Sequence, residues 1–228
     1  MKILYLIPAR GGSKGLPGKN IKILNGKPLI NHTIDFVRSF TDDANICVST
    51  DSDEIIKCVE KNNLKVHFKR PSNISSDTAS TIDVIKHAIG YFHSKGKSFD
   101  TLILLQPTTP FRKKQDLKNM IDIWDNQLDL LVSVKESHES PYFNLFEENT
   151  KGYLLKSKKV NISRRQDAPK VYAFNGSIYI YNINSINLNK INSFKKIKKY
   201  IMSDPAYSVD IDSEFDFILA EIISKNLI

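Results

Sequence analysis

The first apolar segment of the chain runs into a glycine-rich, basic loop, and this junction limits the folds that the chain can adopt. Residues 2–7 read KILYLI, a short apolar run typical of a strand that is buried on both faces of a parallel sheet. Residues 7–20 then read IPARGGSKGLPGKN, with four glycines and two prolines, so they can continue neither a strand nor a helix. We therefore expect a buried strand whose carboxyl end opens into an exposed loop.

The composition of this loop indicates that it binds phosphate groups. Its glycines let main-chain N–H groups approach a ligand closely, and Arg10, Lys14 and Lys19 surround that backbone with positive charge. A mobile basic surface loop is the alternative interpretation. The loop is not a P-loop, because Ser13 stands where that motif needs a glycine and Asn20 where it needs Ser or Thr. The GxGxxG pattern of dinucleotide-binding folds is also absent from the sequence.

The size and composition of the chain limit its class. Its 228 residues, 41% of them hydrophobic, suit one globular domain with a small appendage, and no run of about 20 apolar residues could span a bilayer. The first residues lack the apolar length and the cleavage site of a signal peptide, so we expect a cytoplasmic protein. Cys47 and Cys58 are expected to be buried thiols. The net charge of +8 fits nucleic acid or anionic small substrates, and the basic run 195–199 is interpreted as a solvated face.

Apolar runs alternate with helical patterns along most of the chain. We expect helices over 28–40, 55–62, 77–93 and 114–126, alternating with strands over 45–50, 64–68, 101–105 and 128–134. Such alternation predicts an α/β fold, an open and mostly parallel sheet with helices on both faces. Ligands of such sheets bind beyond the carboxyl ends of the strands, so the glycine loop, Asp51, Arg70 and Gln106 should share one rim. Asp51 and Glu54 also have the spacing of a helix capping box.

The pattern changes after about residue 136. Residues 137–170 mix polar and aromatic residues without a helical period, so we expect β-hairpins or an arm inserted into the single domain 1–228. Apolar residues within 142–146 suit either an interface or a self-packed satellite. The remaining predicted elements are strands over 177–181 and 207–211 and a final helix from Ser213.

Two aspartates near the end of the chain suit a metal ion. If 207–211 is a strand, Asp210 and Asp212 point to one face, where their charges repel unless a cation lies between them. Mg²⁺ commonly takes one or two carboxylates and completes its shell with water and substrate phosphates. Alternatively Asp212 only begins the final helix, for which Ser213 and Asp216 form a capping box, but this leaves Asp210 unexplained. The five histidines show no zinc spacing, and there is no GxSxG nucleophile motif.

Six segments occur in a familiar order between about residues 3 and 221: IPARGGSKGLPGKN, STDSDEI, SSDTAS, LLQPTTPFR, NGSIYI and YSVDIDSEFDF. Together they resemble the acylneuraminate cytidylyltransferases, the enzymes that make CMP-sialic acid and related CMP-nonulosonates. The resemblance implies a nucleotide-diphospho-sugar transferase-like fold, a homodimer with its arm at 137–170, and Mg²⁺ as cofactor. It also implies the reaction, in which CMP passes from CTP to a nine-carbon 2-keto acid sugar and pyrophosphate is released.

The resemblance further implies roles for individual residues. The implied catalytic residues are Arg10, Lys19, Asp210 and Asp212, of which Lys19 offsets charge on the departing pyrophosphate and the two aspartates hold Mg²⁺. The implied nucleotide-binding residues are Arg10, Gly11, Gly12, Ser13, Lys14, Lys19, Asn20, Arg70, Ala79, Ser80 and Thr81. The implied sugar-binding residues are Gln106, Thr108, Thr109, Arg112, Arg165, Asn175, Tyr179 and Phe194, with Arg165 reaching the sugar carboxylate across a dimer interface.

One departure from the family pattern concerns the sugar. Members specific for N-acetylneuraminate can carry Arg-Pro before the Asn-Gly motif, whereas this chain has Ala173 and Phe174. Legionaminic or pseudaminic acid therefore stays open beside sialic acid. Kdo cytidylyltransferases are the rival for the reaction, but their loop typically differs from Gly12-Ser13-Lys14-Gly15. A non-catalytic nucleotide-binding or RNA-binding module is the rival from another class, and the sequence shows no aromatic stacking platform for RNA.

Overall fold

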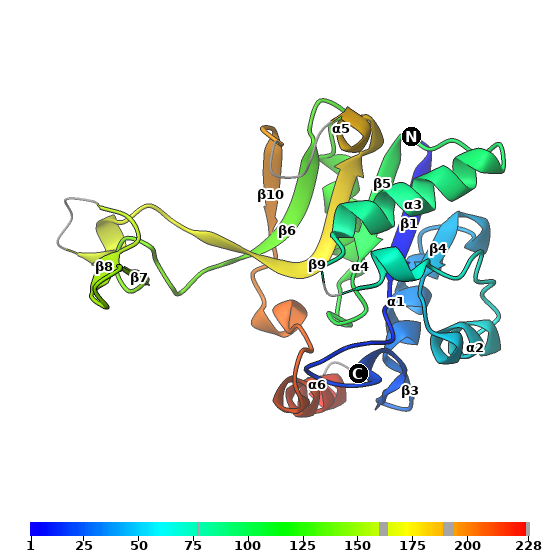
Figure 1. Cartoon of the computed structure of the whole chain (residues 1–228), viewed down its shortest axis with the longest axis horizontal. Coiled ribbons are helices and arrows are strands. Elements are labelled where there is room, and N and C mark those ends of the chain that lie inside the picture. The colour runs from blue at the N-terminus through cyan, green and yellow to red at the C-terminus, as the bar shows by residue number, and fades with distance from the viewer. Residues whose placement is uncertain (77, 160–163, 189–193, 227–228) are drawn as a thin grey trace.

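The central sheet has six strands in the order β10-β6-β9-β5-β1-β4 (Figure 1). The computed structural model describes residues 1–76, 78–159, 164–188 and 194–226. The strands of the sheet are β1 (Ile3–Pro8), β4 (Ile46–Ser49), β5 (Thr101–Leu105), β6 (Leu130–Glu136), β9 (Tyr172–Asn182) and β10 (Ile197–Ile201). β9 runs antiparallel to both of its neighbours, and the other pairings are parallel. The predicted open, mostly parallel sheet is confirmed.

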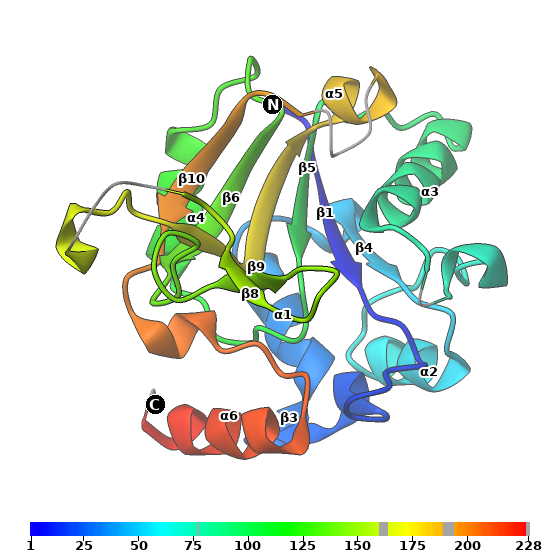
Figure 2. The same cartoon turned by 60° about the vertical axis from the view of Figure 1, so that its left-hand side comes forward.

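Helices cover both faces of this sheet (Figure 2). They are α1 (Leu29–Arg38), α2 (Asp53–Lys61), α3 (Thr81–Ser94), α4 (Lys114–Asp122) and α5 (Ile183–Leu188), whereas α6 (Glu214–Asn226) packs in a separate, smaller core. Successive residues of β1 point to opposite faces, so Tyr5 and Ile7 pack with α1, α2 and α4, whereas Leu4 and Leu6 pack with α3 and α5. Because both faces are buried, the strand needs apolar residues at every position, which is the run that the sequence shows.

The small hairpin after the glycine loop has a local cause. β2 (Ile23–Leu24) and β3 (Lys27–Pro28) pair antiparallel across Asn25 and Gly26, and both of these residues have positive φ. Asn-Gly is the preferred pair for such a two-residue turn. Leu24 is buried with Leu29 and with Phe217 of α6, so the hairpin closes a third, smaller core.

Two predicted strands are wrong. Residues 64–68 form no strand, and among the described residues this part of the chain meets the sheet through a parallel bridge just after the segment, between Thr50 and Lys69. Residues 207–211 form none either, because Pro205–Ser208 is a 3-10 helix in which the Asp204 carboxylate accepts the Ala206 N–H. The basic run 195–199 contributes instead to the edge strand β10, where its lysines remain exposed. Lysines on an edge strand discourage pairing with another chain.

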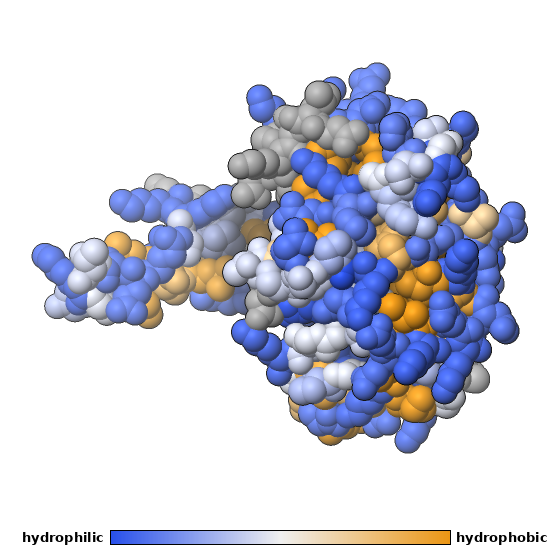
Figure 3. Space-filling view, turned by 45° about the vertical axis from the view of Figure 1, so that its right-hand side comes forward, coloured by the Kyte–Doolittle hydropathy of each residue, from blue (hydrophilic) through white to orange (hydrophobic). Residues whose placement is uncertain are grey.

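The arm leaves the sheet between β6 and β9. Its hairpin consists of β7 (Phe146–Glu148) and β8 (Leu154–Lys156), and Figure 1 shows it standing clear of the body. Exposed apolar side chains gather along it, as Figure 3 shows, and include Leu145, Phe146, Tyr153, Leu154 and Leu155. That this arm makes a dimer stays a prediction. Among the described helices, none combines the length and apolarity needed to cross a membrane.

Candidate active site

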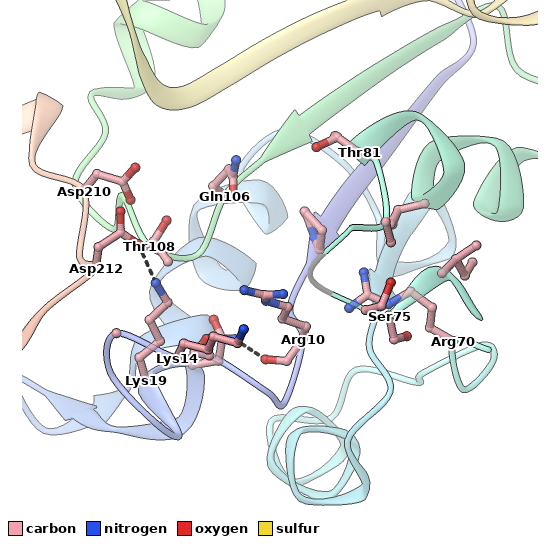
Figure 4. A pocket seen from close by; sticks show the side chains of 18 residues that line it. Arg10, Lys14, Lys19, Arg70, Ser75, Thr81, Gln106, Thr108, Asp210 and Asp212 are labelled. Atoms are coloured by element: carbon pink, nitrogen blue, oxygen red, sulfur yellow. Dashed lines mark hydrogen bonds and ion pairs between the residues drawn. The ribbon is translucent and has the colours of Figure 1, made fainter. Parts of the chain in front are cut away.

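A cavity of about 550 Å³ opens at the carboxyl ends of β1 and β5 (Figure 4). Its lining comes from the glycine loop, the segment before α3, the loop after β5 and the segment before α6. The predicted site residues that line it are Arg10, Ser13, Lys14, Lys19, Asn20, Arg70, Ala79, Thr81, Gln106, Thr108, Asp210 and Asp212. The structure thus brings together residues that are up to 202 positions apart, as expected for strand ends that meet at one rim.

The beginning of the glycine loop is fixed by the turn that follows β4. Ser52, not Asp51, caps α2, because its hydroxyl accepts the Ile55 N–H. Asp51 is therefore available to the loop, and its Oδ1 accepts the Gly11 N–H at 2.9 Å. A side chain at Gly11 would meet the Ser52 Cβ at 2.8 Å, so only glycine lets the two segments pack this closely. The predicted capping box of Asp51 and Glu54 is therefore wrong: the cap is Ser52, one residue later, and it acts alone because Ile55 cannot bond back to it.

The end of the loop contacts the segment that carries the two aspartates. Lys19 Nζ donates to Asp212 Oδ1 and to the Ile211 carbonyl, each at 2.8 Å. A Cβ on Gly15 would lie 2.3 Å from the Asp212 carbonyl oxygen, so the backbones touch at this point. Asn20 donates through Nδ2 to the Arg10 carbonyl at 3.0 Å, while its buried Oδ1 has no hydrogen-bond partner among the described residues. The loop and the aspartate segment consequently form one wall.

Asp210 lies against a glycine of β9. A Cβ on Gly176, which has φ of 73°, would meet Asp210 Oδ2 at 2.9 Å. Burial raises the pKa of Asp210, and the Asp212 charge raises it further, whereas a hydrogen bond from the Thr108 side chain lowers it. The Ile211 N–H also donates to the Thr108 carbonyl at 2.8 Å. Backbone pairing to the β5 loop thus places the aspartates, although the segment is not the strand that we expected.

Asp210 and Asp212 fit Mg²⁺ as a donor set. Both carboxylates line the same cavity, and Asp210 is a partly desolvated anion that a cation would stabilise. Among the described residues, no group of three or more His, Cys, Asp or Glu side chains could hold a metal ion. A magnesium ion at this site would therefore need water and substrate phosphates as further ligands, which is its usual mode of binding in proteins.

Arg70 faces the cavity from the opposite side. Its guanidinium is buried, and Nη2 lies 3.7 Å from Asp51 Oδ1. Its Nε and Nη2 have no hydrogen-bond partner among the described residues. Burial lowers the pKa of Arg70, with Asp51 acting against this and the charge of Arg10 adding to it. A buried cation with unused donors in a cavity wall is suited to bind an anionic or carbonyl oxygen.

The helix α3 begins later than expected, at Thr81 instead of 77. Ser80 is its N-cap, and Ser80 and Asp83 form a capping box in which each side chain accepts the other's N–H. Ala79 and Thr81 line the cavity beside this helix start, but Ser80 does not. The N–H groups at the start of α3 are thus capped by the helix's own side chains. Ala79, the residue before the cap, lines the cavity.

The loop after β5 divides between the cavity and the core. Gln106 and Thr108 line the cavity, whereas Thr109 and Arg112 are buried beneath it. Arg112 donates to the Gln106 and Ser177 carbonyls and to the hydroxyls of Thr33 and Thr109. Burial lowers the pKa of Arg112 to about 9, with the Asp210 charge acting in the opposite direction, so the guanidinium keeps its charge at pH 7. Arg112 therefore supports this loop and does not reach the cavity.

The other residues implied for the sugar lie apart. Asn175 is buried and bonds to Ser133 and Ser208, and Phe194 packs against Tyr181 at the far end of β9, where β5 and β6 begin. Neither side chain lines the nucleotide cavity, and the sugar-binding role of both stays a prediction. Tyr179 lies near enough to Asp210 for the aspartate's charge to raise its pKa, after the larger effect of burial. Arg165 falls in the 3-10 helix Arg165–Asp167 of the arm, and its side chain lies outside the described residues.

A second cavity, of about 1270 Å³, adjoins the first. It is lined by the base of the arm and by residues 201–210, and Asp210 lines both cavities. Ala173, at the position where the sequence departs from the family pattern, also lines it. The sequence did not indicate this cavity or a role for Gly176, and it placed Asp51 at the rim as a helix cap, not as a partner of Gly11. Ser52 followed by the acidic pair Asp53 and Glu54 could have indicated the true helix cap, whereas the contact between Gly176 and Asp210 has no local signal.

Comparisons with known proteins agree on one family. A sequence model of the family described as Cytidylyltransferase matches residues 4–224. The chain is 37% identical over 229 residues to post-translational flagellin modification protein B of Campylobacter coli, covering 98% of this chain and 95% of that one. It is 33% identical to the CMP-N,N'-diacetyllegionaminic acid synthase of Legionella pneumophila, covering 97% and 95%. A solved CMP:2-keto-3-deoxy-manno-octonic acid synthetase complexed with CTP shares the fold, with a TM-score of 0.74, 18% identity and full coverage of both chains. The chain therefore belongs to the cytidylyltransferase family of nucleotidyltransferases.

Proposed function

We propose that this enzyme transfers CMP from CTP to the anomeric hydroxyl of a nonulosonic acid and releases pyrophosphate. The observation that carries the proposal is the wall in which a basic glycine loop meets two aspartates through Lys19. Transfer at a phosphate depends mostly on positioning and on neutralising charge, which are the properties of this wall. The family and the relatives named above support the nucleotide and the class of acceptor.

Different residues of the chain bind the triphosphate and the cytidine part of CTP. Arg10, Lys14 and Lys19 hold the triphosphate, beside Ser13 and Gly15 of the same loop. Lys19 lies where negative charge collects as pyrophosphate departs, so it stabilises the transition state more than the bound CTP. Arg70, with Ala79 and Thr81 opposite, holds the cytidine part through its unused donors. These roles rest on the cavity lining and on the charge of the residues.

Asp210 and Asp212 are the residues that would hold Mg²⁺. When bound, the ion neutralises charge on the phosphates and supplies electrophilic activation of the α-phosphate. The carboxylate of Asp210, at the junction of the two cavities, also lies where it can accept a proton from the acceptor hydroxyl. Thr108 orients this carboxylate through its hydrogen bond.

The acceptor occupies the second cavity, beside the base of the arm. Asp210 lines both cavities, so an acceptor there would approach the nucleotide from the aspartate side. We propose a legionaminic-type acid as the first candidate, because one relative named above is a legionaminic acid synthase and because Ala173 lines this cavity. The enzyme works as a cytoplasmic homodimer in this proposal, in which the arm of one copy, with Arg165, closes the acceptor site of the other.

The experiment is a pyrophosphate-release assay with Mg²⁺. CTP is paired in turn with N-acetylneuraminic, N,N'-diacetyllegionaminic, pseudaminic and Kdo acids, and UTP and ATP replace CTP as nucleotide controls. We expect turnover with CTP and one nine-carbon acid, and none without the divalent ion. Turnover with Kdo alone would replace the acceptor class, and no turnover from a protein that binds CTP in calorimetry would contradict the enzymatic proposal.

A further inference from the structure

Asp51 is an acidic residue beside a site for a polyanion, which is unfavourable unless the carboxylate has another task. It lies directly after β4, faces the first turn of the glycine loop, and accepts the Gly11 N–H at 2.9 Å. Ser52 already caps α2, so helix formation does not explain Asp51. The chain therefore keeps a negative charge next to its phosphate loop for a reason outside secondary structure.

The neighbours of Asp51 supply that reason. Arg70 is 6% exposed, and its Nη2 lies 3.7 Å from Asp51 Oδ1, the same oxygen that Gly11 uses. Arg10 is close enough for its charge to lower the pKa of Arg70, after the larger effect of burial. Two guanidinium groups that both line one cavity repel each other, and Asp51 lies beside Arg70 as a counter-charge.

The geometry also leaves the donors of Arg70 available. The distance of 3.7 Å makes an ion pair without a hydrogen bond, and Nε and Nη2 have no partner in the described part of the chain. The Arg70 backbone is held separately, since its N–H donates to the Thr50 carbonyl at 2.7 Å. Asp51 can thus stabilise the charge of Arg70 without using up the N–H groups that a ligand needs.

We propose that Asp51 is a positioning residue for the nucleotide site, which holds the Gly11 turn and the Arg70 guanidinium in one network so that both face the same ligand. This inference rests on the proposed function, in that the ligand is CTP. It assigns to Asp51 no contact with the substrate. Its effect is to couple the phosphate end of the cavity to the end that holds cytidine.

Two substitutions at Asp51 separate its contributions. Asp51→Asn keeps an oxygen that can accept the Gly11 N–H but removes the charge, and Asp51→Ala removes both. We expect Asp51→Ala to weaken CTP binding roughly 10- to 100-fold, because it loses both the charge and the acceptor, with Asp51→Asn in between. Because Asp51 acts before chemistry, kcat at saturating CTP and the KM for the acid should change much less than the KM for CTP.

The matched control is Asp43→Asn. Asp43 pairs with Arg38 at 2.8 Å on both oxygens, away from the cavity lining, so its loss removes an aspartate–arginine pair without touching the site. Calorimetric CTP binding and thermal midpoints are measured for all variants, together with Arg70→Met alone and combined with Asp51→Ala. The losses of CTP affinity caused by Asp51→Ala and by Arg70→Met should be less than additive in the double variant, because removing either side chain already breaks the network.

Three outcomes would overturn the inference. One is an Asp51→Ala protein that melts earlier but binds CTP as the wild type does, which would show a structural role alone. Another is tighter CTP binding by Asp51→Asn, which would mean that the carboxylate merely repels phosphate. The third is full additivity with Arg70→Met. The turnover of the wild type tests the proposed reaction, and CTP binding by the Asp51 variants tests the network. A wild type that binds CTP without turnover would therefore contradict the reaction alone.

Discussion

Two long segments leave the same rim of the sheet, the glycine loop after β1 and the arm between β6 and β9, and they differ in how they contact the rest of the chain. The glycine loop leaves β1 and is held by Asp51, by its own Asn20, and by the Ile211 carbonyl and the Asp212 carboxylate, which both accept from Lys19. The arm leaves β6 and returns to β9, and its hairpin is closed by bonds within itself, such as that from the Ser157 N–H to the Leu145 carbonyl. Figure 1 shows the first folded against the body and the second projecting from it.

Because of this difference, the loop forms its contacts within the monomer, whereas the arm leaves an apolar surface uncovered. The loop meets its partners within one chain, so the nucleotide side of the cavity is formed by the monomer. The arm keeps Phe146, Leu154 and Leu155 about half exposed or more, and large apolar groups of this kind mark surfaces that a partner covers. We infer that changes in the loop act on chemistry and stability, whereas changes in the arm act on assembly.

The largest expected effect is that of Asp210→Asn. The amide keeps the shape against Gly176 but removes the charge that the proposed Mg²⁺ and proton-acceptor roles require, so turnover should fall on the order of 10³-fold. Pyrophosphate release measures the rate, and circular dichroism checks the fold. Asp122→Asn, an exposed change at the end of α4, serves as the control. Retention of more than a tenth of the wild-type rate would remove Asp210 from the metal site.

Lys19→Met should come next, with a loss on the order of 10²-fold in kcat. In the proposed reaction the methionine leaves the departing pyrophosphate without a cation, and in the folded chain it breaks the contacts to Asp212 and the Ile211 carbonyl. Lys22→Met is the matched control, because Lys22 ties the same region to Glu214 of α6 at 2.6 Å without lining the cavity. If both variants lost stability and rate alike, Lys19 would be a structural tie and not a phosphate ligand.

Gly15→Ala tests whether the wall between loop and aspartates is as tight as the structure indicates. The added methyl would lie 2.3 Å from the Asp212 carbonyl oxygen, so the segment must move, at a cost of about 1–3 kcal/mol in the free energy of unfolding. Gly12→Ala is the comparison, because a Cβ there meets nothing within 4 Å. Thermal or urea unfolding should separate the two variants, and equal stabilities would show that the loop stands free like the arm.

Substitutions in the arm should have the smallest effect on the stability of the folded monomer. Replacing Leu154 and Leu155 by serine removes apolar side chains that are 67% and 56% exposed, so little burial within the chain is lost. We expect an unchanged far-ultraviolet spectrum and a shift from dimer to monomer in analytical ultracentrifugation. Calorimetry should show CTP binding intact while turnover falls. A dimer that survives both substitutions would place the interface elsewhere.

Much of the fold followed from the sequence because its signals are local. The apolar run of β1, the alternation of strands with helices and the glycine-rich loop all lie within a few neighbouring residues, and these predictions are confirmed. The two strands that were wrong, over 64–68 and 207–211, had apolar alternation but lacked a neighbour with which to pair. Strand formation depends on a partner strand, and a short edge or a nearby proline removes that partner.

The candidate site likewise has features that the sequence indicated and features that only the tertiary structure decided. Residue type alone made Arg10, Lys19 and the two aspartates candidates, since cations beside glycines suit phosphate and paired carboxylates suit a metal ion. The structure places all four in the lining of one cavity, and their roles stay predictions. The tertiary structure alone decided that Arg112 supports the site from below, that Phe194 lies at the far end of β9, and that Asp51 belongs to the loop. The physical reason is that charge and backbone freedom belong to a residue, whereas burial and partners belong to the packed sheet that brings distant residues together.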